Sequence, residues 1–502
     1  MDACCGQPFS SRRRKVLKGV GGGMLLGGSG LLPACASLQG GGKGVADEFV
    51  IRNAYVVTLD RGVGDMPKGD VHVRNGAIVA VGPQVNAPNA EVLDGAGMIV
   101  VPGFIDTHFH LWNTTLRNMQ RHGMEYFPVK EAFVRHFTAD DHYRANRLAL
   151  AECINAGITT TTNFSHNIRS PAHADAELRA LQESGIRSRY CYGWADPTPR
   201  TQPMDFADVK RVREQWFGGS SPLRGRADLG IAMRGFRLAN DDVVAAEYRF
   251  AREMGLPTIL HTGATKRLGQ SVARIAQVGH IDSTTILAHW IFQKEADLEA
   301  LLKSGASVSL SPQSDLRTPY DNSFQESLLG LRARNVNLCM SIDSALIGGV
   351  SMFDQMATTW YMGVPHYDTP TEKLPLVDFT YCLEMATING ARALGWADRV
   401  GSITPGKRAD LVMVRATDLN IAPLGEVHSA LARAATVSNV DTVICDGRVL
   451  KRAGRLVGLD VPTIVAEAEQ SLAGLRSRAG PNWQPKALRP EERELAMLGA
   501  CA

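Results

Sequence analysis

The sequence lacks the cysteine spacing of small disulfide-rich or zinc-finger proteins. Its 502 residues include nine cysteines, and no two of them stand in a CxxC pattern. Scattered cysteines of this kind exclude both a zinc-finger array and a disulfide framework. Cys153, Cys191 and Cys339 lie in apolar segments, so we expect them to be core residues.

The sequence also lacks a strong charge of one sign, internal repeats and long low-complexity tracts. Its formal net charge is +3, and residues 1–34 hold five basic side chains against one acidic side chain. The basic excess belongs to this N-terminal segment, so the composition gives no argument for a nucleic-acid partner. A chain of this length predicts a large core and more than one domain.

The N-terminal segment resembles an export signal. In "RRRKVLKGVGGGMLLGGSGLLPACAS", basic residues precede a Gly-rich stretch that is too short and too weakly apolar to predict a membrane-spanning helix. Arg13 and Arg14 fit the arginine pair of a twin-arginine signal. The ending "LLPACAS" resembles a lipobox, with lipid attached to Cys35, and also an ordinary cleavage site. We therefore expect a periplasmic protein, either soluble or anchored to the membrane as a lipoprotein.

Alternating strand and helix patterns predict the organisation of the remaining chain. Short strands with Gly and Asn turns fill residues 49–101 and return at 401–458, which predicts a small β domain. Between them, residues 102–400 hold eight strand candidates separated by helical stretches, beginning with "MIVVPGFIDTHFH". Eight such units predict a TIM barrel. Residues 1–35 are the predicted export signal, 36–48 a linker, and 459–502 a C-terminal helix and tail.

Residues able to bind a metal ion end several of the predicted barrel strands. They are His108 and His110 on the first strand, His166 on the second, His261 on the fifth, His289 on the sixth and Asp343 on the eighth. Active sites of this barrel lie at the C-terminal ends of its strands. Side chains two apart in a strand point the same way, so the first two histidines can bind one ion together. Three histidines and a carboxylate with an open position are typical of a catalytic metal site.

Several motifs then resemble the amidohydrolase superfamily, in particular its cytosine-deaminase-like and triazine-hydrolase-like branch. The motifs are "PGFIDTHFH", "ILHTG", "ILAHW", "CMSIDS", "MATINGARALG" and "VGSITPGKRADLVMV". The resemblance covers roughly residues 49–457. It implies an α/β fold, in which a distorted TIM (β/α)8 barrel lies on a small β-sandwich built from both chain ends, 49–101 and 401–458.

The resemblance also implies roles for single residues. His108, His110, His261 and Asp343 would hold one divalent ion, zinc first, with iron and manganese as alternatives. Asp343 would also take a proton from the attacking water, and His289 would polarise the group under attack. A zinc-type ion lowers the pKa of its bound water to about 7, and a carboxylate in contact with that water can move the proton.

Two departures from the family pattern bear on the reaction. Some members bridge two metals with a carboxylated lysine on strand four, but here that strand reads "LGIAMRGF" and predicts a single metal. Deaminase-like members carry a glutamate three residues after the strand-five histidine, where this chain has Ala264. Alanine cannot transfer protons, which weakens the deaminase interpretation.

Further side chains after strand ends are candidates for substrate contact. They are Trp112, His166, Trp194, Trp290, Phe292 and Arg317. An aromatic-lined mouth suits a planar or aryl small molecule, although core packing explains each aromatic residue equally well.

These features predict an exported, metal-dependent hydrolase that cleaves a non-peptide C–N bond in an amide, urea or carbamate. One alternative is an aminohydrolase or dechlorinase acting on a nitrogen heterocycle. Another is a non-catalytic ligand-binding lipoprotein. The sequence is also compatible with a homo-oligomer.

Overall fold

The computed structural model describes residues 47–121, 126–263, 271–291, 293–317, 323–363 and 377–481. The chain divides into two compact units, Met1–Gly42 and Lys43–Ala502, and every described residue belongs to the second. The predicted export signal with Cys35 lies outside the described residues, as do Ala264 and Phe292. Within the described ranges, no helix combines the length and apolar character needed to cross a membrane.

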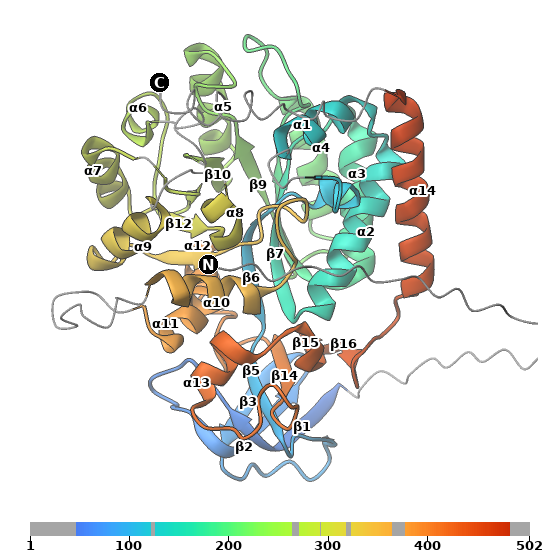
Figure 1. Cartoon of the computed structure of the whole chain (residues 1–502), viewed down its shortest axis with the longest axis vertical. Helices are drawn as coiled ribbons and strands as arrows, with labels where there is room; N and C mark the ends of the chain where they lie inside the picture. Colours follow the sequence, from blue (N-terminus) through green and yellow to red (C-terminus); the bar gives the residue numbers. More distant parts are fainter. Residues whose placement is uncertain are drawn as a thin grey trace, which may run out of the picture. The chain divides into compact units, whose positions relative to one another are not determined.

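A barrel-like parallel sheet forms the larger part of the structure (Figure 1). Its eight strands are β6 (Phe104–Phe109), β7 (Ile158–Ser165), β8 (Arg187–Tyr192), β9 (Ala227–Met233), β10 (Thr258–His261), β11 (Ile286–Ala288), β12 (Ser307–Leu310) and β13 (Leu338–Met340). Neighbours in space are neighbours in sequence, and all seven pairs are parallel. The predicted TIM-like α/β fold is confirmed.

The first and last strands of this sheet approach each other at predicted metal ligands. The Asp343 N–H donates to the His108 carbonyl at 2.8 Å, and the His110 N–H donates to the Asp343 carbonyl at 2.8 Å. Two residues before His108 on β6, a carboxylate oxygen of Asp106 accepts the Ile342 N–H at 3.0 Å. Barrel closure therefore places residues of β6 and of the segment after β13 side by side.

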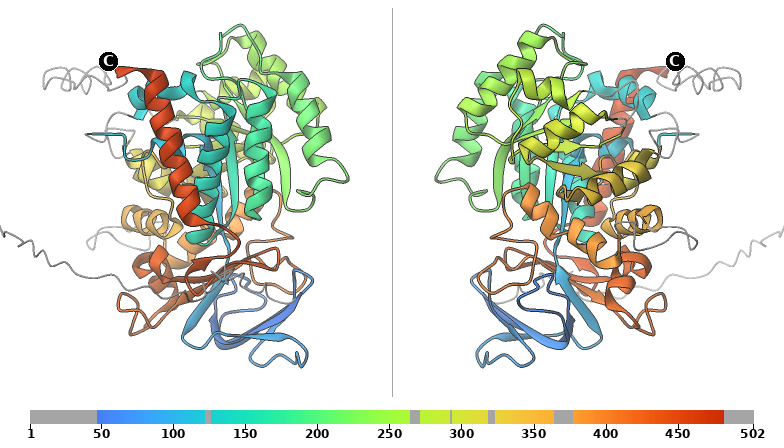
Figure 2. Two further views of the ribbon diagram at one scale, coloured as in Figure 1. Left: turned by 90° about the vertical axis from the view of Figure 1, so that its right-hand side faces the viewer. Right: turned by 90° about the vertical axis from the view of Figure 1, so that its left-hand side faces the viewer.

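Helices cover the outside of the barrel (Figures 1 and 2). They are η1 (Leu111–Leu116), α1 (Tyr126–Phe133), η2 (Val134–His136), α2 (Ala139–Asn155), α3 (Pro171–Ser184), α4 (Phe206–Phe217), α5 (Asp241–Glu253), α6 (Val272–Val278), α7 (Glu295–Ser304), α8 (Pro312–Arg317), α9 (Ser323–Ala333), α10 (Met352–Gly363), α11 (Phe379–Met385) and α12 (Ile388–Ala393). Capping fixes several starts: at α2, Thr138 and Asp141 form a reciprocal capping box.

The predicted C-terminal helix is α14 (Val461–Ala479), and it lies beside α2 (Figure 1). Ser471 Oγ donates to Asp141 Oδ1 at 2.7 Å, and Arg147 forms an ion pair with Glu467. The helix thus packs on the outside of the helices that surround the barrel.

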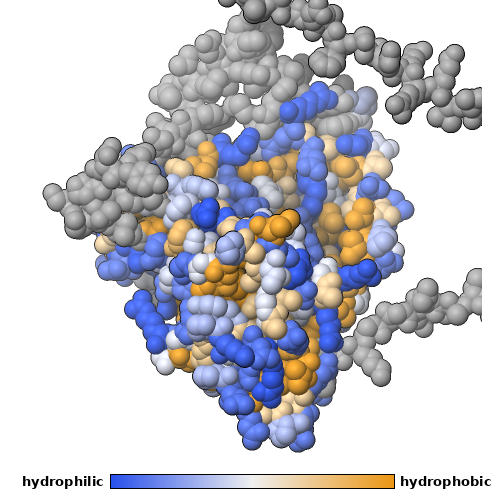
Figure 3. Space-filling model, turned by 60° about the horizontal axis from the view of Figure 1, so that its bottom comes forward, coloured by the Kyte–Doolittle hydropathy of each residue, from blue (hydrophilic) through white to orange (hydrophobic). Residues whose placement is uncertain are grey.

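A second sheet combines both ends of the described chain. Its nine strands are β1 (Glu48–Val56), β2 (Met66–Arg74), β3 (Ala77–Gly82), β4 (Glu91–Asp94), β5 (Met98–Pro102), β14 (Leu411–Arg415), β15 (Val440–Cys445), β16 (Arg448–Arg452) and β17 (Arg455–Leu456). Short helical segments α13 (Val427–Ser429), η4 (Ala430–Ala434) and η5 (Val437–Asn439) precede β15. Strands β5 and β14 join the two halves in antiparallel register, with Val101 opposite Val412. Polar and apolar side chains are mixed over the face seen in Figure 3.

The stretch "MIVVPGFIDTHFH" forms two strands, which differs from the single strand that we predicted. Strand β5 belongs to the second sheet and β6 to the barrel, with Gly103 between them. A Cβ atom on Gly103 would lie 2.1 Å from Thr159 Oγ1, so only glycine fits this crossing point. A buried apolar run does not reveal which sheet each of its parts joins.

The barrel and the second sheet each have an apolar core, and a buried ion pair links them. Arg187, at the start of β8, is fully buried and bonds both oxygens of Asp410 at 2.9 and 3.1 Å. It also bonds Asp446 at 3.1 Å. The predicted core cysteines Cys153, Cys191 and Cys339 are indeed buried and free of disulfides.

Candidate active site

Five predicted site residues meet at the C-terminal ends of four barrel strands. His108 is the fifth residue of β6, and His110 follows that strand directly. His261 is the last residue of β10, His289 follows β11, and Asp343 lies three residues after β13. Parallel strands bring these ends to one edge of the barrel, which is why residues up to 235 positions apart meet there.

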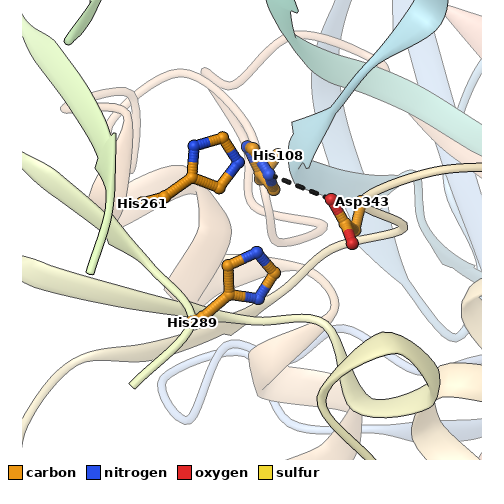
Figure 4. Close-up of side chains that lie close together, drawn as sticks. All are labelled: His108, His261, His289 and Asp343. Atoms are coloured by element: carbon orange, nitrogen blue, oxygen red, sulfur yellow. Dashed lines mark ion pairs between the residues drawn. The ribbon is translucent and has the colours of Figure 1, made fainter. Parts of the chain in front are cut away.

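The side chains of His108, His261, His289 and Asp343 point toward a common space (Figure 4). One ligand atom from each of His108, His261, His289 and Asp343 lies within 4.8 Å of the others. His110 also contacts this group, because its Nε2 lies 3.2 Å from His261 Nε2 and 3.3 Å from Asp343 Oδ1. Asp343 Oδ1 is also 3.3 Å from His108 Nε2. The same carboxylate oxygen thus faces both histidines of the β6 motif.

This donor set fits one divalent cation. Both ring nitrogens of His108 are buried, and within the described chain neither has a hydrogen-bond partner. Such orphaned nitrogens are unusual, because buried polar atoms are normally paired. Imidazole nitrogens together with one carboxylate are the ligands that zinc prefers in catalytic sites.

The electrostatics of the cluster favour the ligand forms of these side chains. Burial lowers the pKa of His108 to about 3 and lowers the pKa of His261 well below its ordinary value. Burial opposes ionisation of Asp343, but the rings of His108 and His110, each with Nε2 3.3 Å from its Oδ1, hold its pKa well below the ordinary value. Neutral imidazoles and an ionised carboxylate are the forms that bind a metal.

His289 differs from the other histidines because a buried carboxylate stands behind it. Its Nδ1 lies 2.6 Å from Asp315 Oδ1, and both side chains are buried. Burial disfavours the charged ring, but the Asp315 carboxylate outweighs it and raises the pKa of His289 to about 9. Asp315 in turn accepts the Ser311 N–H at 2.8 Å. His289 is therefore oriented and made basic by its neighbour.

Our sequence analysis did not identify Asp315 or Ser314. Asp315 lies on α8, five residues after the end of β12, and Ser314 Oγ donates to the second oxygen of Asp343. The signal that was present is an acidic residue soon after a barrel strand, in "SLSPQSD". Only the fold shows that this one short helix supports two site residues.

Strained backbone occurs at two of the site residues. His289 and Asp343 both have φ of 63°, a left-handed conformation that β-carbon-bearing residues rarely adopt. Such conformations persist where the surrounding structure determines them, and they concentrate at functional sites.

A wall of aromatic rings borders the cluster on the side of His110. The His166 ring lies 4.7 Å from the His110 ring and 5.3 Å from the Trp194 ring, measured between centroids. Trp112 is fully buried and donates from Nε1 to His166 Nδ1 at 3.1 Å. Gly193 permits this close packing, because a Cβ there would lie 2.7 Å from the Ser165 carbonyl.

The other two described candidates for substrate contact, Trp290 and Arg317, lie apart from this wall. Trp290 follows His289 and is buried in the main apolar core. Arg317 ends α8 and lines a cavity of about 430 Å³ together with Arg117, Gln120 and Glu152.

Comparison with known proteins identifies the family. The model of the amidohydrolase family matches residues 99–450, which include all five residues of the cluster. The chain belongs to the amidohydrolase family. Membership confirms the predicted enzyme class, a hydrolase acting on C–N bonds other than peptide bonds.

Curated relatives of this amidohydrolase match over nearly their whole length. A 5'-deoxyadenosine deaminase of Methanosarcina mazei is 27% identical, with 86% of this chain and 99% of the relative covered. A 5-methylthioadenosine/S-adenosylhomocysteine deaminase of Desulforudis audaxviator is also 27% identical, with 84% and 98% covered.

Solved structures show the same fold. A zinc-bound adenosine deaminase from Xanthomonas campestris matches with a TM-score of 0.73 and 24% identity, covering 86% of this chain and 98% of that one. A zinc complex of atrazine chlorohydrolase from Arthrobacter aurescens matches with a TM-score of 0.73 and 19% identity, covering 84% and 100%.

At strand four, this amidohydrolase has no lysine. Strand β9 ends at Met233, and the next residue, Arg234, is buried and bonds Glu247 Oε1 at 2.6 Å. An arginine cannot become a bridging carbamate. The prediction of a single metal ion therefore depends on the residue types of this strand.

Proposed function

We propose that this amidohydrolase uses one divalent ion, zinc first, to hydrolyse a C–N bond in an amide, urea or carbamate of a planar or aryl molecule. The observation that carries the proposal is the convergence of three histidines and Asp343 around one point, with His289 held beside them by Asp315.

His108, His110, His261 and Asp343 would hold the divalent ion, which would supply a water acidified to near neutral pKa. Asp343 is placed to accept a proton from the attacking water, and Ser314 fixes its second oxygen so that the first faces the site. His289 donates a hydrogen bond from Nε2 to the oxygen of the attacked carbonyl, because Asp315 engages Nδ1. Asp343 then returns its proton to the leaving nitrogen.

Ala264 favours an open carbonyl substrate over a ring. Among the described residues, Asp343 and Asp315 are the carboxylates found at the cluster, and Asp315 is committed to His289. We therefore assign both proton transfers to Asp343. It can do so when the leaving nitrogen rotates toward it, as the nitrogen of an amide or urea does. A nitrogen fixed in a heterocycle lacks this freedom.

The second candidate is release of an amine or chloride from a nitrogen heterocycle. The names of the relatives support it, since both curated relatives described above are deaminases of adenosine-type compounds. It requires a proton donor other than the glutamate that Ala264 replaces.

A matched substrate panel separates the two candidates. The zinc-loaded enzyme is assayed for kcat/KM on aryl amides, ureas and carbamates, and on aminopyrimidines, aminopurines and aminotriazines. We expect the first group to react faster. A tenfold advantage of an amino-heterocycle, about 1.4 kcal/mol in barrier, would establish the second candidate instead. Absence of turnover on every substrate would favour a ligand-binding protein.

The same panel tests the base. Asp343→Asn with its metal restored should lose about 10²–10⁴-fold in rate, the usual contribution of a general base. Asp297→Asn is the matched control. It alters a buried carboxylate on α7 that bonds Ser271 at 2.8 Å, away from the cluster, and should retain normal turnover. Near-normal turnover by Asp343→Asn would assign the proton to another residue.

We also propose export by the twin-arginine-like signal, with attachment to the membrane through Cys35. The arginine pair and the "LLPACAS" motif support it. Replacing Arg13 and Arg14 by lysine should retain the precursor in the cytoplasm, and Cys35→Ala should release the exported protein from the membrane. Fractionation that finds the unaltered protein only in the cytoplasm would exclude export.

A further inference from the structure

The contact between Trp112 and His166 determines which nitrogen of His166 carries the proton. An indole N–H is a donor and never an acceptor. Because Trp112 Nε1 lies 3.1 Å from His166 Nδ1, that imidazole nitrogen must accept. The ring proton of His166 is then on Nε2, and the ring is the neutral tautomer.

Among the described residues, the Nε2–H of His166 has no acceptor at ordinary hydrogen-bond distance. The nearest carboxylate oxygen in the described part of the chain, Asp196 Oδ2, is 3.5 Å away. That distance is longer than an ordinary N–H···O bond. Asp196 is engaged elsewhere, since Lys130 Nζ bonds the same oxygen at 2.7 Å. The donor therefore remains available to a ligand.

The ring of His166 lies at the edge of the metal cluster. It packs edge-on against predicted ligand His110 and beside Trp194. The His166 side chain is 6% exposed, so a group that reaches it leaves bulk water. A hydrogen bond in such surroundings discriminates between ligands more strongly than one at the surface.

Packing behind Trp112 makes this arrangement rigid. The indole stacks on His142, with centroids 5.9 Å apart and planes 12° apart, and contacts the edge of Phe137. His142 is itself held by the buried Glu177 at 2.7 Å. Trp112 has no exposed surface, so it acts on a substrate only through His166.

We propose that Trp112 is a positioning residue that fixes His166 as a neutral Nε2–H donor, and that His166 selects planar substrates with a hydrogen-bond acceptor, such as a ring nitrogen, near the hydrolysed bond. This inference rests on the proposed function for the location of the substrate. It adds the acceptor as a requirement on substrate chemistry.

The tautomer is measured first, without any substrate. In the zinc-loaded protein labelled with ¹⁵N-histidine, His166 should show a protonated Nε2 and a bare Nδ1, and His166→Gln identifies its signals. Trp112→Phe should change this pattern. Trp216→Phe is the matched control, because it removes an indole N–H bond to Asp175, 2.7 Å long, on the outer helices. A protonated Nδ1 in the unaltered protein would refute the proposal.

Selectivity is measured next by calorimetric binding of benzamide, nicotinamide and isonicotinamide to the zinc-loaded protein. The three probes have nearly equal size. Benzamide has no ring nitrogen, and the two pyridines have one each, at different ring positions. At least one pyridine should bind fivefold more tightly than benzamide, about 1 kcal/mol. Trp112→Phe and His166→Leu should abolish this preference, His166→Gln should keep part of it, and Trp216→Phe should keep it all.

Two outcomes would overturn the proposal: equal binding of all three probes, or a preference that survives His166→Leu. A uniform loss of binding by Trp112→Phe would likewise show that the indole only supports the fold. These readouts do not need turnover. A protein that shows the tautomer and the preference but hydrolyses no C–N substrate would refute the proposed function and leave this inference standing.

Discussion

At the residue scale, the site depends on side chains that contact the predicted ligands from behind. Ser314 and Asp315 are adjacent on α8, yet one bonds Asp343 and the other bonds His289. A single turn of helix therefore orients both the proposed base and the proposed hydrogen-bond donor. Mutations on α8 should affect rate without removing the metal.

Asp315→Asn tests this division of labour. The amide cannot hold a proton on His289 as a carboxylate does, so the basicity of the ring should fall. We expect kcat to decrease at least about 10²-fold, the lower range for acid–base catalysis, at unchanged metal content. Rate and elemental analysis are measured on the same sample. Loss of the metal, or a normal rate, would contradict the assigned role.

At the element scale, charged groups that are mostly buried connect the second sheet to the barrel. Arg187 brings two carboxylates, Asp410 and Asp446, to the start of β8. Lys451 on β16 is also buried, and its Nζ donates to the Asn155 carbonyl at the end of α2, at 2.8 Å. These contacts set how the sheet meets the end of the barrel opposite the active site.

Removing Arg187 should destabilise the fold strongly. Arg187→Met leaves the buried Asp410 carboxylate without its ion-pair partner, and breaking such a pair reduces the free energy of unfolding by about 3–5 kcal/mol. Arg274→Met is the matched control, since the Arg274–Asp241 pair is 51% and 57% exposed. It should change stability by less than about 1 kcal/mol. Urea unfolding measures both, and similar losses in the two variants would contradict this account.

Lys451 predicts a pH dependence of stability. Burial lowers its pKa from 10.5 to about 8 in the folded protein. The unfolded chain therefore binds this proton more readily, and stability from this group increases as pH rises from 8 to 10.5. Lys451→Met removes the effect. The measurement is the melting temperature of Lys451→Met minus that of the unaltered protein, followed with pH. This difference should be highest near neutral pH and should fall steadily toward alkaline pH. A difference that does not change with pH would disprove the assignment.

At the scale of the whole molecule, the barrel closes where the metal is predicted to bind. The backbones of His108, His110 and Asp343 bond one another, and their side chains face the same point. An ion held there would tie the first barrel strand to the segment after the last one.

Purified protein should contain about one divalent ion per chain, because the cluster supplies one four-ligand set. His108→Ala and His261→Ala should lose the ion, while His289→Asn should keep it and lose rate. Elemental analysis of the three variants beside the unaltered protein decides the point. Two tightly bound ions per chain would falsify the mononuclear site.

The sequence by itself determined the alternation of strands and helices, the second domain from both chain ends, and the identity of the strand-end residues His108, His110, His261, His289 and Asp343. These follow from local periodicity and from the rule that barrel sites lie at strand ends. The sequence did not show that "MIVVPGFIDTHFH" divides between two sheets, because a buried run reads alike in either one.

Only the tertiary structure decided which groups stand behind those residues. Asp315, Ser314 and the donor from Trp112 to His166 depend on contacts between segments 26 to 54 residues apart. Their residue types are common, and no short spacing marks them. Their roles in the site depend on the orientation and burial of their side chains. Both are determined only when the barrel brings separate strand ends to a single edge.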